Sequence, residues 1–207
     1  MSRPIPPESS AGRCFDLLAA TLGWFLISPL LALMALLIRL DSPGPVLFRQ
    51  VRIGRNGRPF VVYKFRTMRT GSDAPPAAAS EPGIDFERFV YTPDRPDPRV
   101  TPVGRALRHT SLDEMPQLLN VILGDMAIVG PRPEIPEVVR QYPPPFHARH
   151  TVRPGITGLA QVRGRADLTY AEIIRYDLAY VRRHSLRNDL AILGRTLGAV
   201  LRAAGAR

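Results

Sequence analysis

The chain has 207 residues, a net charge of +10 and a single cysteine, Cys14, which excludes an intramolecular disulfide and disfavours a thiolate metal site. Its length suits one compact domain beside an apolar segment near the start, and not two domains. The basic excess allows an anionic partner, but without paired zinc-ligand spacings, an aromatic-rich basic strand or a recognition-helix pattern we expect no nucleic acid partner.

The segment from Leu17 to Ile38 contains no charged residue. At about 1.5 Å per helical residue it could just cross a hydrocarbon core of roughly 30 Å. Ser28-Pro29 lies in its middle, and a proline inside a helix removes one backbone hydrogen bond and clashes with the preceding turn. We therefore expect a sharp bend there, with the serine hydroxyl satisfying a freed carbonyl, and each half is then too short to span a bilayer.

Basic residues flank this segment on both sides. Arg3 and Arg13 precede it, and the basic stretch from Arg39 to Arg69 follows with one acid, Asp41. The positive-inside tendency then gives no asymmetry, and arginine-rich flanks suit an anionic inner leaflet. Both ends of the segment are therefore expected at the cytoplasmic face of a membrane.

These features predict a flexible N-terminus over residues 1–12, a re-entrant helix-break-helix hairpin over 13–40 and one catalytic or binding domain over 41–207. A transmembrane anchor that tolerates its proline is the alternative. A secretory signal peptide is disfavoured, because no small-residue cleavage site follows Ile38 and the next segment is strongly basic.

Two extended-looking segments, Val46 to Ile53 and Arg58 to Met68, are joined through Asn56-Gly57, the dipeptide that most favours a tight hairpin turn. We predict a β-hairpin, in which alternation places Lys64 and Arg66 on the same face. Lys64 is the one lysine among 28 basic residues. One hypothesis is that this position requires a compact ammonium that arginine cannot replace, and chance is the alternative.

Residues 70–99 are rich in proline and show little periodic apolar pattern, which predicts a long irregular loop that could cover a site. Beyond it, Ser111 and Glu114 have the spacing of a capping box, and Gly124 is a good helix stop. We therefore predict a helix of about three turns that begins near Asp113. In the structural alternative, Glu114 only caps this helix and Asp113 only complements its dipole.

Three arginine-bearing elements surround this carboxylate pair in the sequence. Arg108 precedes it by about one turn, Arg132 follows between two prolines that restrict its backbone, and a glycine-rich segment runs from Arg153 to Arg165. Arginine matches the geometry of phosphate oxygens, and glycine lets a backbone approach a ligand closely. Together the elements suggest a phosphate-bearing substrate with a divalent cation, although glycines with arginines are usually turns with a solvated face.

Two further helices are expected near the C-terminus. Thr169 and Glu172 form a second capping box, which opens a helix that we interpret as scaffold. Residues 188–203 have leucines on one side and arginines elsewhere, which fits an amphipathic helix lying on a membrane interface. The same apolar side could instead pack on the core.

Separate motifs cover most of the chain in a fixed order: Arg13-Cys-Phe-Asp16, the Ser28-Pro29 break, Gly44-Pro-Val-Leu-Phe-Arg-Gln50, Tyr63-Lys-Phe-Arg-Thr-Met68, Ser111-Leu-Asp-Glu-Met-Pro-Gln117, Val129-Gly-Pro-Arg-Pro133, Pro154-Gly-Ile-Thr-Gly158 and Gly164-Arg165. With these motifs the chain resembles the monotopic bacterial phosphoglycosyl transferases, the sugar transferases that start glycan assembly on a polyprenol phosphate carrier. Joint matching of so many motifs is far more specific than a lone fingerprint.

The resemblance implies a fold and a location. It implies an α/β protein with a re-entrant membrane helix bent at Ser28-Pro29, and one small cytosolic α/β domain that carries the β-hairpin and amphipathic interfacial helices. We accordingly expect the chain at the cytoplasmic face of the bacterial inner membrane.

The resemblance also implies a two-step reaction. Asp113 would attack the sugar-bearing phosphate of a UDP-sugar and release UMP, and undecaprenyl phosphate would then take the phosphosugar from Asp113. Mg²⁺, with Asp113 as its expected protein ligand, would offset the negative charges. We place Glu114 beside Asp113 as the second catalytic residue, in the role of metal ligand, base or helix cap, and the cations at the phosphates: Lys64, Arg66, Arg108, Arg132 and Arg165.

Two other functions compete with this one. A membrane-tethered module that binds anionic lipid or nucleic acid would explain the basic charge, and a non-catalytic scaffold of a glycan assembly complex would explain the fold. Neither explains Asp113. The transferred sugar, the glycan pathway and the oligomeric state do not follow from the sequence.

Overall fold

The computed structural model of the chain describes residues 9–71, 83–90, 97–164 and 168–201. The expected flexible N-terminus lies outside these ranges up to residue 8, and the first helix already begins at Ser10. The elements are, in chain order, α1 (Ser10–Asp41), β1 (Leu47–Ile53), η1 (Arg55–Gly57), β2 (Pro59–Phe65), α3 (Pro102–Thr110), η2 (Leu112–Glu114), α4 (Gln117–Leu123), β3 (Ala127–Val129), α5 (Pro136–Val139), η3 (Pro144–Thr151), β4 (Gly155–Thr157), α6 (Tyr170–Arg183) and α7 (Leu186–Leu201).

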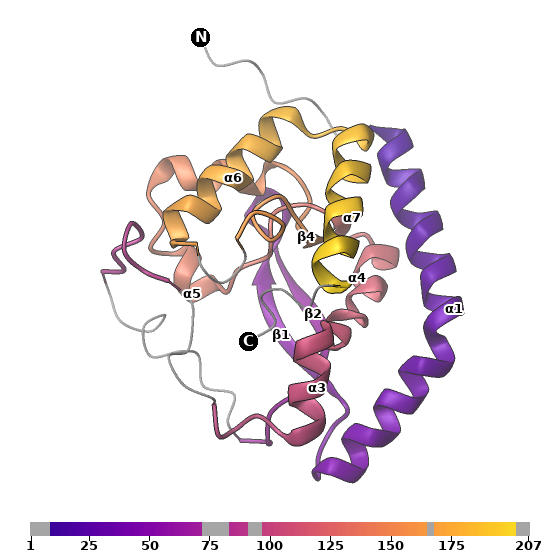
Figure 1. Cartoon of the computed structure of the whole chain (residues 1–207). Coiled ribbons are helices and arrows are strands. Elements are labelled where there is room, and N and C mark those ends of the chain that lie inside the picture. Colours follow the sequence, from indigo (N-terminus) through magenta and orange to yellow (C-terminus); the bar gives the residue numbers. More distant parts are fainter. Residues whose placement is uncertain (1–8, 72–82, 91–96, 165–167, 202–207) are drawn as a thin grey trace.

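The apolar segment forms one continuous helix, α1, which bows in its middle and follows one side of the domain (Figure 1). Pro29 lies inside it and cannot donate to the carbonyl of Phe25, four residues earlier. The Ser28 hydroxyl donates to that carbonyl instead, at 2.8 Å. The prediction that the serine satisfies a freed carbonyl is confirmed. Because of this replacement the segment bends without separating into the two short helices that we predicted.

One face of α1 packs on the domain near both of its ends. In the N-terminal half, Ala20 is buried against β2 and α4, and in the C-terminal half Ile38 is buried against β2 and α3. The opposite face exposes large apolar side chains along its whole length: Leu18, Leu22, Phe25, Leu26, Leu30, Leu33, Leu36, Leu37 and Leu40. By length and composition α1 is able to cross a membrane.

The predicted β-hairpin is present. β1 and β2 pair antiparallel from Leu47 opposite Phe65 to Ile53 opposite Pro59. Asn56 and Gly57 both have positive φ, 57° and 74°, as a turn of this kind requires. The connection is longer than a two-residue turn, because η1 lies inside it.

The outer edge of β2 is closed by a side chain of α4. Asn120, which is fully buried, donates from Nδ2 to the carbonyl of Val61 at 2.6 Å and accepts from the amide of Tyr63 at 3.1 Å. The amide group thus replaces the neighbouring strand that these backbone groups lack. It also fixes α4 against the strand that carries Lys64.

The glycine-rich segment packs on the chain itself. β3 and β4 pair in parallel, and a Cβ atom added to Gly155 would lie 2.0 Å from the amide nitrogen of Gly130. At Gly158 an added Cβ would lie 2.3 Å from the carbonyl oxygen of Gly130. We expected these glycines to approach a ligand, but they allow two backbone segments to touch.

The described parts of the 70–99 segment contain turns and one isolated bridge, from Val90 to Thr169, as predicted for an irregular loop. Within residues 83–90, Phe86 belongs to the core, where its ring is buried against those of Tyr142 and Tyr170. The prediction that this loop covers a site falls on residues 72–82 and 91–96, which lie outside the described ranges.

The two C-terminal helices agree with their patterns. Thr169 and Glu172 form the predicted capping box at the start of α6. In α7, Ile192 is buried in the core, whereas Leu190 and Leu197 are 51% and 62% exposed. One side of α7 thus packs on the domain, and its other side leaves leucines at the surface.

Candidate active site

The carboxylate pair lies in a tight turn between α3 and α4. Ser111 ends α3 in the left-handed conformation, with φ of 59°, and its side chain makes no capping bond. The expected capping box with Glu114 is therefore absent, and α4 begins only at Gln117, after the 3₁₀ turn η2. The predicted helix end is confirmed, since Gly124 closes α4 with φ of 99°.

Glu114 accepts from two cations. Lys64 Nζ lies 2.9 Å from Oε1, while Arg132 donates from Nη2 to Oε1 at 2.6 Å and from Nη1 to Oε2 at 3.3 Å. Burial favours the protonated form of Glu114, but the charges and hydrogen bonds of Arg132 and Lys64 outweigh it and hold its pKa well below the usual range. Glu114 is thus held in its ionised form, which makes it a poor proton acceptor and lets it bind both cations.

Asp113, which directly precedes Glu114, is half-buried, and its carboxylate is open to a ligand. Within the residues that the structure describes, its carboxylate makes no hydrogen bond or ion pair. Burial raises its pKa, as does the negative charge of Glu114, and the positive charges of Lys64, Arg132 and Arg108 oppose this rise. An open carboxylate beside three cations is suited to meet an anionic substrate.

The structure brings together most of the predicted cations. Lys64 and Arg132 bind Glu114, and Arg108, in the last turn of α3, is oriented by a bond of 2.8 Å from its Nε to the Thr67 hydroxyl. The side chain of Arg132 is 43% exposed, so its guanidinium can reach a ligand as well as Glu114. Arg165 lies outside the described residues.

Arg66 is not part of this cluster. It is buried, and its guanidinium donates to the carbonyls of Ser42 at 2.6 Å and Pro43 at 2.8 Å, and to the Ser42 hydroxyl. These groups follow the C-terminus of α1, where carbonyls lack helical partners and attract a cation. Alternation along β2 predicted a shared face with Lys64, but Arg66 lies just past the end of the strand, where the pattern no longer applies.

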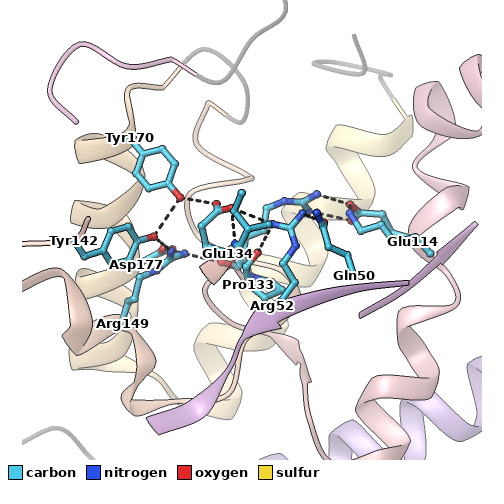
Figure 2. A network of polar contacts seen from close by, with 12 residues as sticks. Gln50, Arg52, Glu114, Pro133, Glu134, Tyr142, Arg149, Tyr170 and Asp177 are labelled. Carbon is cyan, nitrogen blue, oxygen red and sulfur yellow. Dashed lines mark hydrogen bonds and ion pairs between the residues drawn. The ribbon is translucent and has the colours of Figure 1, made fainter. Parts of the chain in front are cut away.

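A buried polar network adjoins the site and was missed from the sequence. It runs from Asp177 and Tyr170 to Glu114, and Figure 2 shows it as a series of contacts around the segment that carries Arg132. Arg149 and Asp177 form a buried ion pair of 2.6 Å, and Arg52 pairs with Glu134 at 3.0 Å. Glu134 directly follows Arg132-Pro133, and this adjacency was the one feature of the sequence that could have pointed to it.

Asp113 is the carboxylate of the site that could bind Mg²⁺. Among the described residues no group of three or more His, Cys, Asp or Glu side chains gathers. Both oxygens of Glu114 are taken by Lys64 and Arg132, so Asp113 is the carboxylate with open lone pairs. Since Mg²⁺ commonly uses one or two carboxylates and completes its shell with phosphates and water, Asp113 could hold it together with a diphosphate.

The structure combines an apolar helix, long enough to cross a membrane, with an open carboxylate among cations on a small α/β domain. Comparison with known proteins identifies the family of the chain. The family described as bacterial sugar transferase matches residues 8–203. The chain belongs to this family and is a phosphoglycosyl transferase.

Curated relatives carry names that agree with the family. A protein of Caulobacter vibrioides named UDP-glucose:undecaprenyl-phosphate glucose-1-phosphate transferase is 45% identical over 91% of this chain and 69% of its own length. A protein of the same name from Escherichia coli is 42% identical over 87% of this chain, but this match covers 38% of the relative. The exopolysaccharide production protein ExoY of Rhizobium meliloti is 41% identical over 94% of this chain and 87% of its own length.

Proposed function

We propose that the chain transfers a sugar-1-phosphate from a UDP-sugar to undecaprenyl phosphate through a covalent phosphosugar on Asp113, with release of UMP. The observation that carries this proposal is the contrast within the carboxylate pair. Glu114 is fully engaged by Lys64 and Arg132, whereas Asp113 keeps open oxygens close to the same cations. A nucleophile needs an open lone pair, and an anionic one needs positive charge nearby to approach a diphosphate.

In the first step an oxygen of Asp113 attacks the sugar-bearing phosphorus, and the bond from this phosphorus to the bridging oxygen breaks. UMP leaves with the electron pair of that bond. In the second step an oxygen of undecaprenyl phosphate attacks the same phosphorus, and the Asp113 carboxylate is released. The product is undecaprenyl diphosphate sugar, so one difficult transfer is divided into two.

The cations have distinct roles in this scheme. Arg132, anchored on Glu114 and partly exposed, binds the diphosphate. Arg108, in the last turn of α3, adds positive charge near Asp113. Lys64 is half-buried beside Glu114, and its compact charge acts on both members of the carboxylate pair. A magnesium ion, when bound at Asp113 and the diphosphate, would neutralise charge on the departing phosphate.

We also propose that α1 enters the cytoplasmic leaflet of the bacterial inner membrane and returns, so that both of its ends stay on one side. The packing of Ala20 and Ile38 on the same domain supports this, because a helix crossing the bilayer would draw β2, α3 and α4 into the hydrocarbon. The exposed leucines of α1 would lie in lipid, and Leu190 and Leu197 of α7 suit the interface. The polyprenol tail would then stay in lipid while its phosphate reaches Asp113.

The test is UMP release from purified chain in detergent or vesicles with undecaprenyl phosphate. Several UDP-sugars are tested as donors, beginning with UDP-glucose and UDP-N-acetylgalactosamine, because relatives are named for these two sugars. Asp113→Asn should lower UMP release roughly a thousandfold or more, and a phosphosugar should be recovered on the Asp113 peptide of the wild-type chain. Normal turnover by Asp113→Asn would exclude it as the nucleophile.

We place this reaction at the first membrane step of bacterial glycan assembly, since relatives are named for exopolysaccharide production. A non-catalytic scaffold would give no UMP. A binding module for anionic lipid or nucleic acid would lose its ligand with added salt and keep it in Asp113→Asn.

A further inference from the structure

The backbone that carries Arg132 is held at four consecutive carbonyls. Two of the residues, Pro131 and Pro133, have no amide hydrogen, so the carbonyl is the one hydrogen-bonding backbone group that all four residues share. Each carbonyl accepts from a different donor: Pro131 from the amide of Gly155 at 3.0 Å, Arg132 from Arg149 Nη2 at 2.7 Å, Pro133 from Arg52 Nη1 at 3.3 Å and Glu134 from the amide of Ile53 at 2.8 Å.

Arg149 is the buried member of this set. Its side chain is 2% exposed, pairs with Asp177 at 2.6 Å and donates from Nη1 to the Tyr142 hydroxyl at 2.6 Å (Figure 2). A buried charge costs free energy unless it is paired and hydrogen-bonded. Arginine spreads its donors over two terminal nitrogens of a rigid planar fork, so Nη1 binds Tyr142 while Nη2 faces Asp177 and the carbonyl of Arg132. A lysine ammonium has its donors on a single nitrogen and does not reproduce this spacing.

The position of Arg149 separates it from the chemistry. Among the described residues, its ion pair and hydrogen bonds are with Asp177, Tyr142 and the carbonyl of Arg132, and none of them involves Asp113 or Glu114. The side chain of Arg132, by contrast, is long and flexible and is 43% exposed. The direction of that side chain therefore depends on how firmly its own backbone is held.

We propose that Arg149 is a positioning residue, which holds the carbonyl of Arg132 and thereby directs the Arg132 guanidinium onto Glu114 and the donor diphosphate. This inference rests on the proposed function, in which Arg132 binds the donor. Arg149 thus affects the transfer only through Arg132.

The first variant is Arg149→Lys, which keeps a cation opposite Asp177 and withdraws the contact with Arg132. Its kcat/KM for UMP release should fall roughly tenfold to a hundredfold, as expected when a binding group is misplaced by a fraction of an ångström or more. Arg153→Lys is the matched control, because Arg153 donates from Nε to the carbonyl of Gly124 at 3.0 Å, at the far end of α4. Thermal unfolding of both variants checks that they remain folded.

A double-mutant cycle then separates positioning from general damage. If Arg149 acts through Arg132, Arg149→Lys should cost less than about twofold in an Arg132→Ala background. Costs that multiply in the double variant would overturn the proposal, because they would mean that the two residues act independently.

Hydrogen exchange supplies a test that needs no turnover. In Arg149→Lys the peptide over residues 129–135 should exchange faster than in the wild type, while the β1–β2 hairpin stays unchanged. In Arg153→Lys the 129–135 peptide should exchange as in the wild type. Unchanged exchange of this peptide in Arg149→Lys would overturn the positioning role. Absence of UMP release by the wild-type chain would instead overturn the proposed function, and the exchange result would still decide the role of Arg149.

Discussion

At the scale of single residues, the site depends on how one carboxylate is shared. Oε1 of Glu114 accepts from both Lys64 at 2.9 Å and Arg132 at 2.6 Å. Burial lowers the pKa of Lys64, and the charge of Glu114 opposes this shift. The geometry supports the hypothesis that position 64 requires a compact ammonium, because two guanidinium groups at one oxygen would repel and crowd each other.

This arrangement makes Lys64→Arg a sharp test. We expect kcat/KM for UMP release to fall at least about tenfold although the charge is retained, because the larger head group displaces Arg132. Arg69→Lys, at an exposed position outside the cluster, is the control for an arginine and lysine exchange. Wild-type kinetics in Lys64→Arg would leave chance as the explanation of the single lysine.

His150 gives the fold a dependence on pH. Its ring stacks on Tyr142 with 9° between the planes, and burial, followed by the charge of Arg149, lowers its pKa to about 4. An unfolded histidine titrates near 6.5, so the unfolded state gains a proton that the folded state refuses. The contribution of His150 to stability should therefore fall as the pH drops from about 6.5 towards 4, by up to about 3 kcal/mol.

Thermal unfolding of His150→Phe between pH 7 and 5 checks this expectation. Phenylalanine keeps the stacking area and cannot be protonated, so the melting temperature should fall less steeply with acid than in the wild type. The same change at the exposed His109 should leave the slope as it is. Equal slopes in His150→Phe and the wild type would refute the assignment.

At the scale of elements, α1 shows how a side chain can replace a backbone donor. The Ser28 hydroxyl occupies the carbonyl of Phe25 that Pro29 leaves free. Ser28→Ala should therefore lower stability by about 1 kcal/mol, which is typical of a lost hydrogen bond. In a Pro29→Ala background the same change should cost almost nothing, because alanine restores the amide donor. The comparison needs melting temperatures of the wild type and the three variants in one detergent, and equal costs in both backgrounds would contradict it.

Local chemistry explains which elements could be predicted. Asn56-Gly57, Gly124 and the Thr169 capping box act within a few residues, so their positions followed from the sequence. Ser111 and Glu114 have the same capping pattern, yet Glu114 instead binds Lys64, fifty positions away. Long-range partners decide such cases, and a single sequence does not reveal them.

The candidate site divides in the same way. Sequence motifs named Asp113, Glu114, Arg108, Arg132 and Lys64, which the structure places near one another, and their roles in the reaction stay predictions. The motifs gave no reason to assign Arg66 to the end of α1, nor to pair Arg149 with Asp177. In both cases an arginine serves the interior of the fold, and only the packing distinguishes it from an arginine that faces a ligand.

At the scale of the whole molecule, the course of α1 decides how the enzyme sits in a membrane. Cys14 is a free, exposed cysteine near the start of the helix, and Pro45 is exposed just beyond its end. If the helix returns to the same side, a membrane-impermeant maleimide should label Cys14, and a Pro45→Cys variant lacking Cys14, from the cytoplasmic side only. Labelling of the two positions from opposite sides would establish a crossing helix.

The bond between Arg66 and the end of α1 has a mechanical consequence. Arg66 and Lys64 are two residues apart on nearly extended chain, a span of about 7 Å. Arg66 binds the residue that follows α1, and Lys64 binds Glu114, so a short extended segment of backbone connects the end of the apolar helix to the site. With α1 in lipid, a thicker or thinner leaflet would lift or lower the reacting groups with it, so bilayer thickness would itself tune the rate.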